Sequence, residues 1–166
     1  EKNGIGAVLN GMSFNSNSEN IQYHGCGTIY ALASDDDIKQ DIIDNGGFDV
    51  LMNAVQDHKY SEEVTEKAIG ALVKLAVSEN EEGPSKLCAI NEDEIGTVVD
   101  AMKVNAKSVK VQRIGLCLLE VATRSRSSLE SLREDPLSRQ IIKEAMRNFP
   151  DDCQESGGYV LENIDQ

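Results

Sequence analysis

Three stretches of the chain repeat one pattern of apolar and small residues. They read IQYHGCGTIYALA at residues 21–33, VTEKAIGALVKLA at residues 64–76 and VQRIGLCLLEVAT at residues 111–123. The shared positions recur four, eight and eleven residues after the first, which marks one face of an α-helix. These predicted core slots hold Ile21, Gly25, Ile29 and Leu32, then Val64, Ala68, Leu72 and Leu75, then Val111, Gly115, Leu119 and Ala122. The small second residue lets another helix approach closely.

A second motif precedes each of these predicted helices. It reads GAVLNGM at 6–12, FDVLMNAV at 48–55, GTVVDAM at 96–102 and QIIKEAM at 140–146. A fourth copy of the long helix follows the last one, as CQESGGYVLENI at 153–164, with Cys153, Gly157, Leu161 and Ile164 in the core slots. Shorter segments at 35–47, 84–94 and 127–136 fill the gaps and predict a short helix in each unit. A period of about 40–47 residues with two or three helices is typical of armadillo and HEAT solenoids.

The three-helix unit, the Gly-Gly-Phe before the second motif and the helix AIGALVKLA resemble armadillo repeats. The resemblance covers roughly residues 4–164, and the short first helix favours armadillo over HEAT, which shares the period. We therefore expect an all-α fold, an armadillo-like right-handed α-solenoid of about four three-helix repeats. The expected repeats span approximately 4–33, 34–78, 79–125 and 126–164. Because residue 1 is Glu, we expect a segment of a longer protein, whose exposed repeat ends would favour self-association.

Charge and cysteine usage restrict the partners and the compartment. The formal net charge of −13 argues against nucleic acid and against an anionic membrane surface, because both would be repelled. The four cysteines at 26, 88, 117 and 153 show neither a CxxC pair nor metal-ligand spacing. We therefore expect a reducing compartment, the cytoplasm, with the nucleus as the alternative.

Residues that would support catalysis do not converge in the sequence. The two histidines, His24 and His58, belong to different repeats, and neither lies in a metal motif such as HExxH. The acidic runs at 35–37 and 92–94 do not fit a calcium loop and suit helix N-termini instead. We therefore predict no enzymatic activity, no metal site and no cofactor.

The armadillo resemblance implies that the long third helices line a concave groove that binds a partner peptide or domain. The importin-α-like and catenin-like members carry a Trp and an Asn four residues apart on that helix. In this chain the Trp slot holds Gly27, Gly70, Cys117 and Tyr159, and the Asn slot holds Ala31, Lys74, Val121 and Asn163. One turn before the Trp slot lie Tyr23, Glu66, Arg113 and Glu155. Such a mixed row suits a partner with mixed charge and a few apolar anchors. Alternatively, these residues are ordinary solvent-facing side chains.

A second candidate surface is basic. Lys103, Lys107 and Lys110, together with Arg124 and Arg126, would form a docking patch for an acidic or phosphorylated segment. The alternative is a set of solvated helix ends. The sequence thus predicts a non-catalytic scaffold for protein–protein interaction. The alternative function is a regulatory armadillo array that docks within a larger multidomain enzyme, such as a kinase, a ligase or a GTPase regulator.

Overall fold

The computed structural model describes residues 2–77 and 90–166 of the chain. Within these residues there are ten α-helices and no strand, which confirms the all-α prediction. The helices are α1 (Lys2–Phe14), α2 (Glu19–Leu32), α3 (Asp36–Asp44), α4 (Gly47–Asp57), α5 (Glu62–Ala76), α6 (Glu92–Val104), α7 (Val109–Ala122), α8 (Arg126–Glu134), α9 (Ser138–Asn148) and α10 (Pro150–Asp165).

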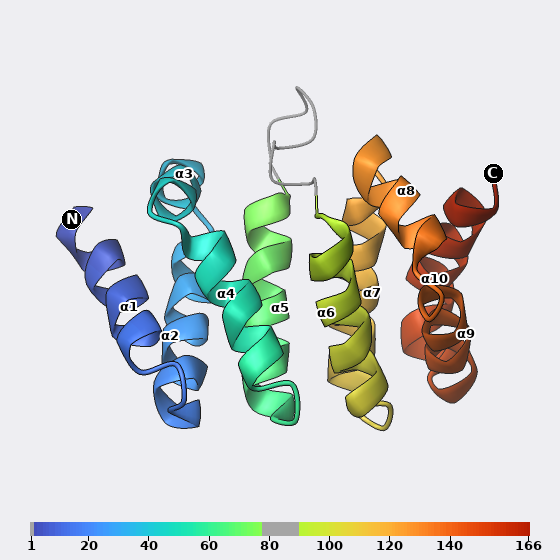
Figure 1. Cartoon of the computed structure of the whole chain (residues 1–166), viewed down its shortest axis with the longest axis horizontal. Coiled ribbons are helices and arrows are strands. Elements are labelled where there is room, and N and C mark those ends of the chain that lie inside the picture. The colour runs from blue at the N-terminus through green and yellow to red at the C-terminus, as the bar shows by residue number, and fades with distance from the viewer. Residues whose placement is uncertain (1, 78–89) are drawn as a thin grey trace.

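The long helices form two layers (Figure 1). Helices α1, α4, α6 and α9 make the first layer. Helices α2, α5, α7 and α10 pack side by side, in that order, as the second layer. The short helices α3 and α8 lie along one edge, and the turns that follow α1, α4 and α6 lie along the opposite edge (Figure 1). This is the arrangement that the repeated pair of motifs predicts.

One of the three predicted short helices is wrong in its bounds. Residues 84–89 of the segment 84–94 lie outside the described residues. The last three residues of that segment, Glu92–Glu94, form the first turn of α6 instead of a separate helix. The reason is local, because the Asn91 side chain accepts a hydrogen bond from the Glu94 backbone while the Glu94 side chain accepts one from the Asn91 backbone. This capping box starts a helix at that point.

Serine starts three of the four second-layer helices. Ser18, Ser61 and Ser108 each have an extended backbone, and each hydroxyl accepts a hydrogen bond from the amide three residues later. A serine oxygen in this position satisfies one of the amides that a helix N-terminus leaves without a partner. In α10 the start is different, because Pro150 follows Phe149 and supplies the fixed φ of a first helical turn.

The core slots are buried wherever a helix has second-layer neighbours on both sides. The slots of α5 and α7 are all buried. Ile21, by contrast, is 36% exposed and Leu32 is half-buried, which corrects the prediction for α2. The cause is position, since α2 is the first helix of its layer and packs against α5 on one side only. Leu161 is also half-buried, and its neighbour Val160 is fully buried in its place.

The two layers interlock through a methionine and a glycine. In the first unit the side chain of Met12 lies against Gly25, so that a Cβ on the glycine would stand 2.4 Å from the methionine Cγ. Met102 covers Gly115 in the same way, at 2.6 Å from Sδ and 2.7 Å from Cγ. In α4 and α5 the equivalent positions hold Val55 and Ala68. A shorter first-layer side chain thus accompanies a larger second-layer residue.

Buried glutamines also join the layers. Gln22 donates through Nε2 to the carbonyls of Met12 and Asn15 at 2.8 and 3.1 Å. Two repeats later, Gln112 makes the same contacts with the carbonyls of Met102 and Asn105, at 2.7 and 3.0 Å. Each side chain satisfies carbonyls that end a first-layer helix, where intrahelical donors are missing.

Candidate functional site

The face of the second layer that turns away from the first layer is the predicted groove, and we call it the long-helix face. The residues of the second core slot point at the first layer. A residue two positions later is rotated by about 200° because an α-helix advances about 100° per residue. Gly27, Gly70, Cys117 and Tyr159 therefore lie on the long-helix face. The helix register thus agrees with the row that the armadillo resemblance implies.

At the α2 end of the long-helix face there is an open hollow of about 420 Å³. Its lining residues are Tyr23, His24, Gly27, Thr28, Ala31, Leu32 and Lys67. A Cβ on Gly27 would meet no atom within 4 Å, so the space above this residue is free. The lining combines small residues with two aromatic rings, those of Tyr23 and His24, and the Lys67 ammonium.

The next position along this face is already covered. The ring of Tyr30 lies over Gly70, where a Cβ would stand 3.3 Å from two ring carbons. Lys74 lies over the same ring, 4.1 Å from its centroid, and also donates to the Ser34 hydroxyl at 2.7 Å. Lys67 lies 6.0 Å from the centroid. Sequence reasoning missed Tyr30, because its slot is not one of the aligned positions.

Charged residues on the middle of the long-helix face are partly paired. Glu66 of α5 forms an ion pair with Lys110 of α7, with 3.5 Å between Oε2 and Nζ. Arg113 and Glu155, in the equivalent positions of α7 and α10, are exposed. The predicted row of Tyr, Glu, Arg and Glu is thus present, with its first glutamate engaged by a neighbouring helix.

Between α7 and α10 the face carries the Cys117 thiol instead of an aromatic residue, and Cys153 of α10 fills a buried core slot. Cys117 is half-buried and Cys153 is fully buried. Burial raises the pKa of Cys117, and the nearby Glu120 carboxylate raises this pKa further. The pKa of Cys153 is raised by burial and by Asp152. Thiols held in the protonated form are poor nucleophiles, so this pair does not resemble a catalytic cysteine site.

At the far end of the long-helix face Tyr159 is 46% exposed. The Asn163 side chain donates through Nδ2 to the Tyr159 carbonyl at 2.8 Å within the same helix. Arg133 of α8 donates to the Asn163 carbonyl at 3.0 Å. The asparagine amide is thus engaged inside its own helix in this structure.

The predicted basic patch is divided by the fold. Lys107 and Lys110 lie at the start of α7, whereas Arg124 and Arg126 follow its end, so a helix of fourteen residues, Val109–Ala122, separates the two pairs. Lys103, in the last turn of α6, lies on the side of the two lysines. Arg126 also pairs with Glu130 at 3.1 Å. The structure thus brings the three lysines to one edge and leaves the two arginines at the other.

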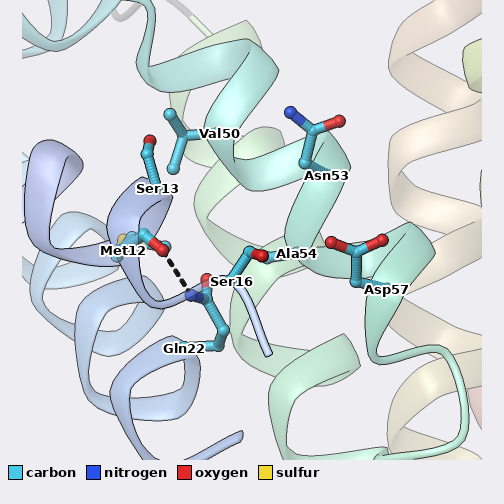
Figure 2. Close-up of a pocket in the computed structure, with 8 residues that line it drawn as sticks. All are labelled: Met12, Ser13, Ser16, Gln22, Val50, Asn53, Ala54 and Asp57. Carbon is cyan, nitrogen blue, oxygen red and sulfur yellow. Dashed lines mark hydrogen bonds between the residues drawn. The ribbon is translucent and has the colours of Figure 1, made fainter. Parts of the chain in front are cut away.

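The first layer holds small polar cavities that the sequence did not predict. One of about 240 Å³ lies where the end of α1 and the start of α2 meet α4 (Figure 2). It is lined by Met12, Ser13, Ser16, Gln22, Val50, Asn53, Ala54 and Asp57, and Figure 2 shows the bond from Gln22 to the Met12 carbonyl. The Ser13 and Ser16 hydroxyls, the Asn53 amide and the Asp57 carboxylate can form hydrogen bonds with a small polar group. Within residues 2–77 and 90–166 no cluster of three or more His, Cys, Asp or Glu side chains is placed to hold a metal.

None of the described helices has the length and apolar character that crossing a bilayer requires.

Comparison with known proteins agrees with the repeat fold. The family profile described as LRRK2 ARM repeat matches residues 1–155. No curated protein matches the sequence significantly. Among solved structures, the chain is similar to the crystal structure of an engineered protein, with a TM-score of 0.67 and 19% identity over 98% of this chain and 63% of that one. A second engineered protein matches with a TM-score of 0.48 and 15% identity, over 98% of this chain and 48% of that one. The chain thus spans less than two thirds of either.

Proposed function

The chain belongs to the LRRK2 ARM repeat family, and on that premise we propose that it is a non-catalytic scaffold that binds a partner protein on its long-helix face. Armadillo repeats form scaffolds that suit protein interaction, because a stack of similar helices presents a long continuous surface. The partner would be an extended segment or a small domain, held in a concave groove by a few anchor contacts.

The open hollow beside Gly27 is the observation that carries this proposal. It offers about 420 Å³ of free space at the α2 end of the row that the armadillo resemblance implies, with Tyr23 and Lys67 among its lining residues. The neighbouring Gly70 position is filled by the protein's own Tyr30. A partner side chain would therefore enter at Gly27, and the rest of its segment would follow the exposed Arg113 and Tyr159 toward α10.

A charge exchange on the long-helix face tests the proposal. The double variant Glu66→Arg and Arg113→Glu keeps the net charge unchanged, so any loss of binding reflects position and not total charge. The matched control is Asp57→Lys with Lys143→Asp, because both residues are exposed on the first layer. We expect a partner captured by the wild-type chain from cell lysate to be lost with the first variant and kept with the control.

The outcomes separate the alternatives. Cross-linking of the captured partner to residues of α2, α5 or α7 on the long-helix face would support the groove. A partner retained by both variants would refute it and place the contact elsewhere. The chain could also capture no partner and bind another part of its own full-length protein. That result would favour the alternative function, a regulatory array that docks intramolecularly.

A further inference from the structure

We infer that the edge formed by the turns after α1, α4 and α6 is a second docking surface, which takes an acidic amphipathic helix of a partner protein. We call it the turn edge and define it by Phe14, Tyr60 and Val104. It lies at the ends of the helices and not on the long-helix face, so it does not depend on the groove. The inference rests on exposure, on rigidity and on charge.

The exposure of the turn edge is unusual for this chain. Phe14 is 87% exposed and Tyr60 is 80% exposed, the two highest values among the large apolar side chains of the described residues. Val104 is 39% exposed. A single exposed apolar residue is ordinary, whereas apolar residues gathered on one surface mark an interaction site. Here the three occupy three consecutive turns on one side of the molecule, the lower edge in Figure 1.

Hydrogen bonds hold these consecutive turns together. His58 donates through Nε2 to the carbonyl of Ser16 in the preceding turn, at 2.5 Å. Asn105 donates through Nδ2 to the carbonyl of Lys59, at 2.7 Å. Both residues occupy the C-cap position of their first-layer helix, so the same link is made twice. The backbones of the three turns are therefore linked in a row, and a partner does not have to order them on binding.

Charge indicates the chemistry of the occupant. Lys103, Lys107 and Lys110 are exposed around the turn between α6 and α7. Helices α2, α5 and α10 carry acidic residues in their first turns, but α7 has none there. The Val104 end of the row is thus locally basic on a chain of net charge −13. The acidic side chains of a short partner helix suit this basic end, whereas an extended anionic surface such as a membrane would also face the acidic remainder of the molecule.

The expected spacing of consecutive turns suits a helix. Packed helices lie roughly 8–10 Å apart, and residues seven apart in an α-helix rise by about 10.5 Å. A helix lying along the edge would therefore place apolar residues at i, i+7 and i+14 over Phe14, Tyr60 and Val104. Its C-terminal end would lie over the lysines, because the partial negative charge of a helix C-terminus and acidic residues both favour cations.

A designed peptide provides the test. The probe is a labelled helical peptide of about 21 residues with leucine at every seventh position and glutamates near its C-terminus. This length covers about two spacings between consecutive turns plus one helical turn at each end. Its binding to the whole chain is followed by fluorescence anisotropy, beside a matched peptide with lysine in place of each glutamate. We expect the acidic peptide to bind at least about tenfold more tightly than the basic one.

Variants locate the contact. Phe14→Ser with Tyr60→Ser, and separately Lys103→Glu with Lys107→Glu, should each weaken binding by about tenfold or more, because anchors and desolvated charges dominate such contacts. Tyr159→Ser on the long-helix face is the control and should bind like wild type. All these side chains are exposed, and an unchanged unfolding midpoint excludes misfolding.

Four results would overturn the inference. They are no binding of the acidic peptide at about 1 mM, equal binding of both peptides, equal loss with the Tyr159→Ser control, and binding of anionic phosphatidylserine vesicles through the same residues. The groove proposal survives the first of these, because it concerns the other face.

Discussion

The interlocked methionine and glycine lead to a quantitative prediction. In Gly115→Ala the new Cβ would stand 2.6 Å from Sδ and 2.7 Å from Cγ of Met102, atoms that cannot move away without a change of rotamer. Alanine favours the helix by about 1 kcal/mol over glycine, and overpacking costs about 1–3 kcal/mol, so we expect a net loss of about 1 kcal/mol in unfolding free energy. Met102→Val alone leaves a void and should cost about 1–2 kcal/mol.

The double variant should be more stable than the sum of these losses predicts. Met102→Val with Gly115→Ala reproduces the pair that α4 and α5 already use, Val55 and Ala68. We expect it to lie within about 1 kcal/mol of wild type, which gives a coupling energy of at least about 1 kcal/mol. Urea unfolding followed by far-ultraviolet circular dichroism measures all four proteins.

A matched control shows whether the effect is local. A Cβ on Gly96, in α6 of the same helix pair, meets nothing within 4 Å. Gly96→Ala should therefore raise the unfolding free energy by about 0.5–1 kcal/mol. If the losses of the two single variants add within about 0.5 kcal/mol, or if Gly115→Ala stabilises as Gly96→Ala does, the interlocking argument is refuted.

Three further predictions follow from the described contacts. Gln112→Leu removes the side-chain donor to the buried Met102 carbonyl, while the Asn105 carbonyl keeps the Ser108 amide. The variant should lower the unfolding free energy by about 1–3 kcal/mol in urea titrations, whereas an unchanged midpoint would contradict the bonding. Burial raises the pKa of Cys26 from 9.0 to about 12, so the unfolded thiol ionises first and stability should fall from pH 9 toward 12, by up to about 1.4 kcal/mol per pH unit from this group. Under reducing conditions Cys26→Ala should make this decline shallower, with the rest due to Cys117 and Cys153, and an identical decline in the variant would refute the assignment. Ile21→Ser should reduce any self-association through the α2 end of the array in sedimentation equilibrium, and an unchanged assembly would place the contact elsewhere.

The periodicity of apolar residues in the sequence predicted most of the fold. The row of Val111, Gly115, Leu119 and Ala122 is buried as expected, because spacing in an α-helix depends only on its pitch. The same spacing did not predict the exposure of Ile21, which shares its slot with two fully buried valines. Whether a core slot is buried depends on the helix that packs against it. The pattern within one helix does not indicate whether that helix is the last in its layer.

For the candidate site, too, the sequence predicted some features and missed others. The sequence predicted which positions of the second-layer helices share a face. It did not predict that Tyr30 covers Gly70 or that α7 separates Arg124 from Lys107. The first is a contact between repeats, and the second depends on the direction in which a helix carries the chain.

Taken alone, the sequence determined the repeated helical unit, its two-layer amphipathic pattern, its negative charge and the places where serine starts a helix, because all of these act over a few residues. Only the tertiary structure decided which slots are open or filled and which turns meet along an edge. Phe14, Tyr60 and Val104 lie more than forty residues apart in sequence, and no local rule relates them. They form one surface because stacking places equivalent turns side by side, and hydrogen bonds from His58 and Asn105 hold them there.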